Sequence, residues 1–208
     1  MKKKFALGCL IVAIAVIVVG GGAAYFYVIR PLTNTVKAAT ELGRISEIEG
    51  GVKNKRSFAA PSDGELKASD VERYLSVTRA VSAGLKGKAE ELQTKYSQLV
   101  DDDRNPSVRQ VIDAYADIIR LVVQAKELQV KALNAEGFSL AEYSWVRREV
   151  YQAAGLGYHA LDLTALSEGE VDEDQDTVLP EAPPKNVELV APHTDELNEY
   201  MPLAVFGL

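Results

Sequence analysis

The stretch SDVERYLSVTRAVSAGLKGKAEELQTKYSQL, residues 69–99, carries the clearest structural pattern in the chain. Side chains that suit a packed face recur in it every seven residues, at Val71, Thr78, Leu85, Leu92 and Leu99. This spacing places them along one face of an α-helix, so the stretch predicts an amphipathic helix of about thirty residues packed in a bundle. Its first residues, Ser69 to Glu72, form a capping-box sequence, which predicts that the helix begins there.

The stretch from Asn105 to Gly137 predicts a second, more deeply buried helix. Asn105 and Pro106 suit an N-cap and a first helical position, and Gly137 suits a helix stop. The apolar residues between them cover more than one helical face. A helix of this kind is expected at the centre of a bundle.

A third helix is predicted to begin at a second capping box, residues 139–142. Phe138 and Tyr143 are placed to pack together as a hydrophobic staple at its start. The apolar pattern that follows predicts that this helix continues past Gly155 as far as Leu166.

The segments outside this bundle, taken as residues 65–166, are assigned by composition. Residues 30–64 predict a membrane-proximal helix, which either extends an anchor or begins the bundle, and then a loop from Gly50 to Gly64. Residues 167–185 are acidic and contain three prolines, which predicts a disordered linker. Residues 186–208 are apolar again, so we expect a short C-terminal helix that returns to the bundle and is covered there. The predicted fold class is therefore all-α, an antiparallel bundle of three long helices plus this short one.

Residues 5–29 contain no charged side chain and directly follow three lysines. A helix of this length rises about 37 Å, enough to cross a hydrocarbon core about 30 Å thick. Because positively charged flanks stay in the cytoplasm, residues 1–4 are predicted to be a cytoplasmic end. The rest of the chain is then exported, and we expect a single-pass protein of a bacterial inner membrane with a periplasmic domain. The predicted membrane-interface residues are Lys2, Lys3, Lys4, Tyr25, Phe26, Tyr27 and Arg30.

Alternatives to a retained transmembrane anchor remain open. The small residues at 20–24 supply a signal-peptide cleavage site at their end, although the apolar run continues to Ile29, as a retained anchor does. Cys9 ends a lipobox-like sequence, but a long apolar run follows it in place of polar residues. A prepilin-like cleavage after Gly8 is set aside because Ala13 stands where such segments carry glutamate.

The net charge of −7 is unevenly distributed along the chain. Residues 167–208 hold eleven acidic residues and one basic residue, whereas residues 31–166 hold nineteen acidic and eighteen basic ones. No basic stripe is left for nucleic acid, so we expect no nucleic-acid partner. Cys9 is the one cysteine, which excludes disulfides within the chain and cysteine-based zinc sites, and we expect no cofactor.

Two sequence patterns suggest chemistry, and each lacks a required part. Asp172, Asp174 and Asp176 have the spacing of the first ligands of a calcium loop, but threonine and proline stand where its glycine and bidentate glutamate belong. A solvated acidic linker is therefore favoured. His159 and Asp162 suit a contact on one helical face, but no strained glycine-rich turn marks a nucleophile. We therefore expect no enzymatic activity.

Residues 143–148 form the densest group of residue types that dominate protein interfaces. The predicted partner-binding residues are Tyr143, Trp145, Arg147 and Arg148. In the apolar segment, Gly20 and Ala24 have the small-xxx-small spacing of closely packed membrane helices. This pair predicts self-association through the anchor.

Two functional hypotheses follow from these patterns. The first is a non-enzymatic scaffold, adaptor or assembly factor, anchored in the lipid bilayer and acting on envelope proteins. The second is a ligand- or lipid-binding sensory bundle, in which aromatic residues surround an apolar cavity. The aromatic residues of the second hypothesis are Tyr74, Tyr96, Tyr115, Tyr143 and Trp145. A filled core favours the first hypothesis, and a sizeable cavity favours the second.

Overall fold

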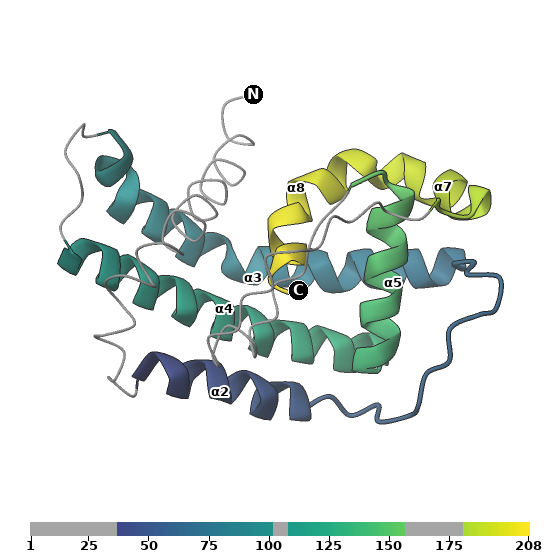
Figure 1. The fold of residues 1–208 in the computed structure, drawn as a ribbon, viewed down its shortest axis with the longest axis horizontal. Helices are drawn as coiled ribbons and strands as arrows, with labels where there is room; N and C mark the ends of the chain where they lie inside the picture. The colour runs from purple at the N-terminus through teal and green to yellow at the C-terminus, as the bar shows by residue number, and fades with distance from the viewer. Residues whose placement is uncertain (1–36, 102–107, 157–180) are drawn as a thin grey trace.

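The computed structural model describes residues 37–101, 108–156 and 181–208, and the regular elements in these ranges are all helical (Figure 1). The elements are α2 (Lys37–Gly50), α3 (Ala68–Asp101), α4 (Val108–Glu136), α5 (Leu140–Ala153), α7 (Pro184–Val190), the 3₁₀ turn η2 (Ala191–His193) and α8 (Thr194–Val205). The predicted all-α class is thus confirmed for the described part of the chain.

Helix α4 is the central element of the fold. Helix α3 packs antiparallel against one side of it, and α2 lies along the other side, parallel to α4 (Figure 1). The buried residues of α4 include the neighbours Val122 and Val123, which point from different faces. The central position expected from the sequence is therefore correct. Helix α2 belongs to the bundle, since Ile45 is buried and Ile48 packs against the core.

Helix α5 differs from the long third helix that the sequence predicts. Its start is as expected, because the Ser139 hydroxyl accepts a hydrogen bond from the Glu142 amide at 3.2 Å and the Phe138 and Tyr143 rings pack 5.7 Å apart. The helix ends at Ala153, and Gly155 adopts a φ of +68°, a left-handed conformation that closes helices. The expected continuation past Gly155 is therefore wrong. Figure 1 shows α5 set across the hairpin of α3 and α4, so the bundle is not uniformly antiparallel.

Helix α3 begins at Ala68, two residues before Asp70, which would be its first residue if Ser69 were the N-cap. The backbone N–H of Lys67 donates to the Asp70 carboxylate at 3.2 Å, and the Lys67 carbonyl accepts from the Asp70 amide at 2.9 Å. A carboxylate at the third helical position thus satisfies the N-cap donor. The prediction that Ser69 caps the helix is wrong, because the Asp70 carboxylate, within the first turn, accepts the hydrogen bond from the N-cap amide.

The C-terminal arm, residues 184–208, is more helical than predicted. Pro183 and Pro184 do not continue the predicted linker, since Pro184 is the first residue of α7, where a missing N–H costs nothing. The arm packs across α5 and α3 (Figure 1). Its inward-facing residues are buried, namely Asn186, Val190, Leu197, Ala204 and Leu208. On its outer side the Arg79 guanidinium donates twice to Glu196, at 2.6 and 2.7 Å.

Asn186 fastens the start of the arm to the loop before α3. Its side-chain oxygen accepts from the Leu66 amide at 2.7 Å, and its side-chain nitrogen donates to the Gly64 carbonyl at 2.9 Å. The residue is fully buried. A buried amide that is paired on both sides fixes two segments far apart in the sequence.

None of the helices within the described ranges is long and apolar enough to cross a membrane. The predicted transmembrane segment, residues 5–29, lies outside those ranges, as does the linker up to residue 180.

We predict that Asn186→Ala lowers the free energy of unfolding by about 2–3 kcal/mol, because two buried backbone groups lose their partners. Val187→Ala is the matched control, since Val187 is the next residue and is exposed. Urea unfolding followed by circular dichroism measures both. Equal stability of the two variants would contradict the role given to Asn186.

Candidate functional site

Lys126 and Gln129 of α4 lie in the interior of the bundle. Lys126 is 5 % exposed and Gln129 is 1 % exposed. A buried ammonium needs nearby acceptors, because it has lost its water. The Lys126 Nζ donates to the Glu49 carboxylate at 2.9 Å and to the Gly207 carbonyl at 3.3 Å, and the Gln129 Nε2 donates to the same carbonyl at 2.8 Å.

Arg147 of α5 brings a second cation to this place. It is 9 % exposed, and its guanidinium lies beside Gly207, where an added Cβ would stand 3.4 Å from Nη1 and 3.3 Å from the Lys126 Nζ. Gly207 also has a φ of +72°, which side chains other than glycine rarely adopt. We call Glu49, Lys126, Gln129, Arg147 and Gly207 the buried polar centre. It joins α2, α4, α5 and the end of the arm.

The electrostatics of the centre favour groups that accept hydrogen bonds. Burial lowers the pKa of Lys126, the Glu49 carboxylate works to raise it, and the nearby Arg147 charge lowers it further. A carbonyl or carboxylate oxygen placed among these donors therefore relieves the cost of burying them. The donors of the centre, Lys126 and Gln129, both bind a backbone carbonyl oxygen.

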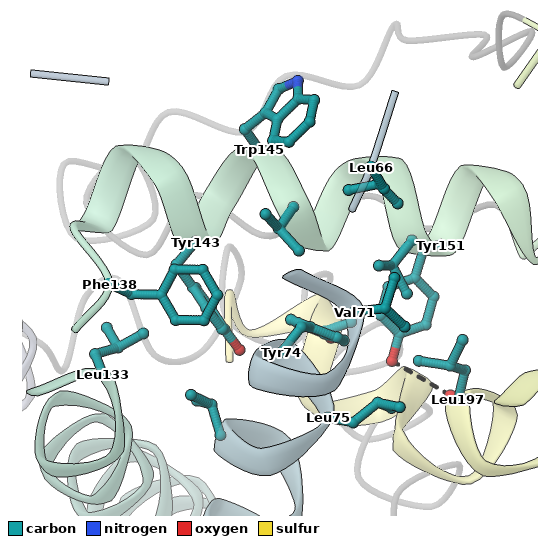
Figure 2. Packing of buried hydrophobic residues seen from close by; sticks show 14 of the residues in the cluster. Leu66, Val71, Tyr74, Leu75, Leu133, Phe138, Tyr143, Trp145, Tyr151 and Leu197 are labelled. Carbon is teal, nitrogen blue, oxygen red and sulfur yellow. Dashed lines mark hydrogen bonds between the residues drawn. The ribbon is translucent and has the colours of Figure 1, made fainter. Parts of the chain in front are cut away.

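A cluster of buried tyrosines fills the space between α3 and α5 (Figure 2). The Tyr74 ring centroid lies 5.5 Å from that of Tyr143 and 6.3 Å from that of Tyr151. The Tyr151 hydroxyl donates to the Leu197 carbonyl at 3.3 Å. The Tyr74 hydroxyl is fully buried and makes no hydrogen bond to any residue in the described ranges. Burial, together with Tyr143 and Tyr151, raises the pKa of Tyr74 well above its usual value.

The structure separates the four predicted partner-binding residues. Tyr143 and Arg147 face the interior, with the Arg147 guanidinium 5.8 Å from the Tyr143 ring centroid. Trp145 is 8 % exposed and packs against Phe58 of the loop after α2, with ring centroids 5.4 Å apart. Arg148 alone of the four has an exposed side chain, at 64 %, and its guanidinium donates to Glu149 at 3.1 Å. Partner binding by these residues stays a prediction, and Arg148 is the one positioned for direct contact.

The other residues singled out in the sequence do not join this site. The Tyr96 hydroxyl donates to Asp117 at 2.7 Å, in a separate group that also contains Lys95. His193 lies with its Nε2 3.8 Å from the Glu72 carboxylate, on the surface of the arm. The remaining candidates lie outside the described residues or have undescribed side chains, namely Lys2, Lys3, Lys4, Gly20, Ala24, Tyr25, Phe26, Tyr27, Arg30, Tyr115, His159, Asp162, Asp172, Asp174 and Asp176. Within the described ranges, no group of three or more metal-ligating side chains has the geometry to hold an ion.

Sequence reasoning missed Lys126, Gln129 and Glu49. A signal for two of them was present, since Lys126 and Gln129 stand at helical spacing between Val122 and Leu133, on the face that α4 buries. A polar residue inside an apolar stripe marks a buried polar contact. The acceptor of this contact is the backbone carbonyl of Gly207, and a backbone group cannot be recognised from the pattern of side chains.

The chain matches no protein-family model, no curated protein and no solved structure.

We predict opposite effects for removing two neighbouring tyrosine hydroxyls. Tyr151→Phe loses a buried hydrogen bond and should lower the free energy of unfolding by about 1 kcal/mol. Tyr74→Phe removes a buried hydroxyl that lacks such a bond and should be neutral or stabilising by up to about 1 kcal/mol. Chemical unfolding of both variants is the measurement, and a larger loss for Tyr74→Phe would contradict this assignment.

A pH dependence follows from the raised pKa of Tyr74. Above about pH 10 the unfolded chain releases this proton while the folded protein keeps it, so the folded state binds more protons and the free energy of unfolding falls as pH rises. We predict a steeper alkaline fall for the wild type than for Tyr74→Phe between about pH 9 and pH 11. Parallel curves for the two proteins would contradict the prediction.

Proposed function

We propose that the protein is a membrane-anchored scaffold or adaptor, without enzymatic activity, whose helical domain works on envelope proteins. In this proposal residues 5–29 form a retained transmembrane helix in a bacterial inner membrane. The three lysines before it stay in the cytoplasm and the domain is periplasmic. Support comes from the length of the uncharged run and from its positively charged flank.

The observation that carries the scaffold proposal is how the charged groups of the domain are used. Ion pairs that join different elements include Arg73 on α3 with Glu142 on α5 at 2.9 Å, Arg79 on α3 with Glu196 on α8 at 2.6 Å, and Lys126 on α4 with Glu49 on α2 at 2.9 Å. Of these pairs, the buried Lys126–Glu49 pair constrains its helices most, because its lysine is withdrawn from water, whereas the partly exposed Arg79–Glu196 pair contributes less. A rigid frame with fixed surfaces suits a protein that positions other proteins.

The sensory hypothesis loses its main argument. It requires five aromatic residues around one cavity, but Tyr74 and Tyr143 pack against each other, Trp145 packs on Phe58, and Tyr96 bonds to Asp117. Side chains that fill the interior in this way favour a scaffold over a ligand-binding bundle.

The anchor also supports this role through concentration. A domain held at a membrane surface meets other membrane proteins at a high effective concentration, so weak contacts are enough. Self-association through Gly20 and Ala24 would place two helical domains in one assembly.

We predict that the full chain, expressed in a bacterium, remains with the membrane after alkaline extraction. A reporter enzyme that is active only in the periplasm, fused after Leu208, should be active. Changing Lys2, Lys3 and Lys4 to glutamate should reduce the reporter activity, because the positive flank sets the orientation.

A matched control for this experiment changes Lys53, Lys55 and Arg56, which are exposed residues of the loop after α2, to glutamate. This variant should keep the wild-type topology. A soluble or cytoplasmic full chain would refute the anchored proposal, and a released periplasmic form would show that the segment is cleaved.

The partner is sought with a photo-crosslinking residue at position 148, and with the same residue at position 145 as the buried control. We predict that position 148 captures one recurrent envelope protein and that position 145 captures none, because Trp145 is covered by Phe58. Equal capture at the two positions, or none at either, would contradict an interface around Arg148.

A further inference from the structure

Residues 203–208 pack against α3 and α4, and we call the surface that they cover the groove. We call residues 203–208 the hook. Leu208 is buried in an apolar cluster with Val81, Leu85 and Ala125, and Leu203 and Phe206 pack against the same cluster. Leu203, Phe206 and Leu208 therefore attach the hook to the bundle.

The backbone of the hook is recognised as well. The Leu208 and Gly207 amides bond back to the Leu203 and Ala204 carbonyls at 3.1 and 2.9 Å, which closes the end of α8. The Gly207 carbonyl points the other way and accepts from Lys126 and Gln129. Two buried side chains of the receiving surface thus bind the main chain of the inserted segment.

The backbone conformation of the hook favours glycine at its second-last position. A methyl group at Gly207 would lie 3.3 Å from the Lys126 Nζ, and its φ of +72° is strained for any other residue. The last position takes a leucine side chain into the apolar cluster. A segment that fits the groove therefore has three features: a glycine, an apolar side chain after it, and a backbone carbonyl that accepts hydrogen bonds.

The attachment of the arm outside the groove includes a partly exposed contact. The Arg79–Glu196 pair joins α8 to α3, and the Arg79 side chain is 45 % exposed, so water and salt weaken this pair. Release of the hook would leave Lys126 and Gln129 without their Gly207 acceptor. An emptied groove would thus favour another segment of the same chemistry over water.

We propose that this groove is a binding site for a partner protein's apolar helix C-terminus that closes with glycine followed by leucine, and that the chain's own hook is its resident competitor. This inference rests on the proposed adaptor function and specifies the kind of partner. Because the hook is part of the same chain, it acts at a high effective concentration and sets a threshold that a partner must exceed.

The test uses the full chain in detergent and a fluorescein-labelled peptide with the sequence of residues 201–208, read by fluorescence polarisation. Glu196→Gln weakens the outer attachment without touching the groove. It should tighten the apparent affinity for the peptide about three- to five-fold over the wild type. Glu199→Gln, the same change at an exposed position of α8, is the matched control and should bind as the wild type does.

A second peptide, with alanine in place of its second-last glycine, tests the groove without altering the protein. It should bind about tenfold more weakly. The proposal is overturned if the alanine peptide binds as tightly as the original peptide. It is also overturned if the Glu196→Gln protein has a wild-type circular dichroism spectrum and binds neither peptide. Concentration-dependent dimers of Glu196→Gln that do not bind peptide would instead indicate exchange of arms between copies, and this would also overturn it.

The two proposals fail separately. Peptide binding in detergent does not depend on which side of a membrane the domain occupies. A peptide-binding chain with the wrong topology would refute the anchored adaptor alone, and a correctly anchored chain that ignores the peptide would refute the groove alone.

Discussion

The burial of Lys126 is the constraint on which the arrangement of the helices depends. Helix α4 is covered on more than one side, so an ammonium on its inner face cannot reach water and must find acceptors on other elements. It finds one on α2, at Glu49, and one at the end of the chain, at Gly207. These two segments are far apart in the sequence, and apolar packing alone would leave their register loosely set. A single buried charge thus fixes where the first described helix and the last one meet the centre of the bundle.

Side chains of the long helices also hold backbone groups at two other described junctions. Asn134 at the end of α4 accepts from the Lys53 amide at 2.7 Å and donates to the Gly51 carbonyl at 3.1 Å. Arg73 donates to the Glu136 carbonyl at 3.1 Å, where α4 ends, and lies with its guanidinium carbon 3.7 Å from the centre of the Phe138 ring. In each case a side chain on a long helix satisfies backbone groups of a loop or a helix end. The segment after α2 and the junction of α4 with α5 are therefore held to the helices by specific hydrogen bonds.

Sequence patterns located the main helices of the described ranges, but not all of their ends and not their arrangement. Periodicity located α3 and α4, and the capping box at Ser139 located the start of α5, because these signals act within a few turns of one helix. The predicted cap of α4, Asn105 and Pro106, lies outside the described residues. The stop at Gly155 was missed because glycine is tolerated inside helices as well as at their ends, and only its φ of +68° decides between the two. The candidate site was predictable in part. Lys126 and Gln129 interrupt an apolar face and so indicate a buried polar contact. Their acceptor, the Gly207 carbonyl, is a backbone group, and only the tertiary fold places it beside α4.

The packing of Trp145 on Phe58 has a practical consequence for experiments. Trp145 is the one tryptophan in 208 residues, and its indole is shielded by a side chain of the segment that joins α2 to α3. Intrinsic fluorescence of this protein therefore reports on one junction, where α5 meets that connecting segment. If the connection lifts off while the helices stay intact, the indole enters water and its emission shifts to longer wavelength, whereas far-ultraviolet ellipticity hardly changes. The molecule thus carries its own label-free optical probe for local opening.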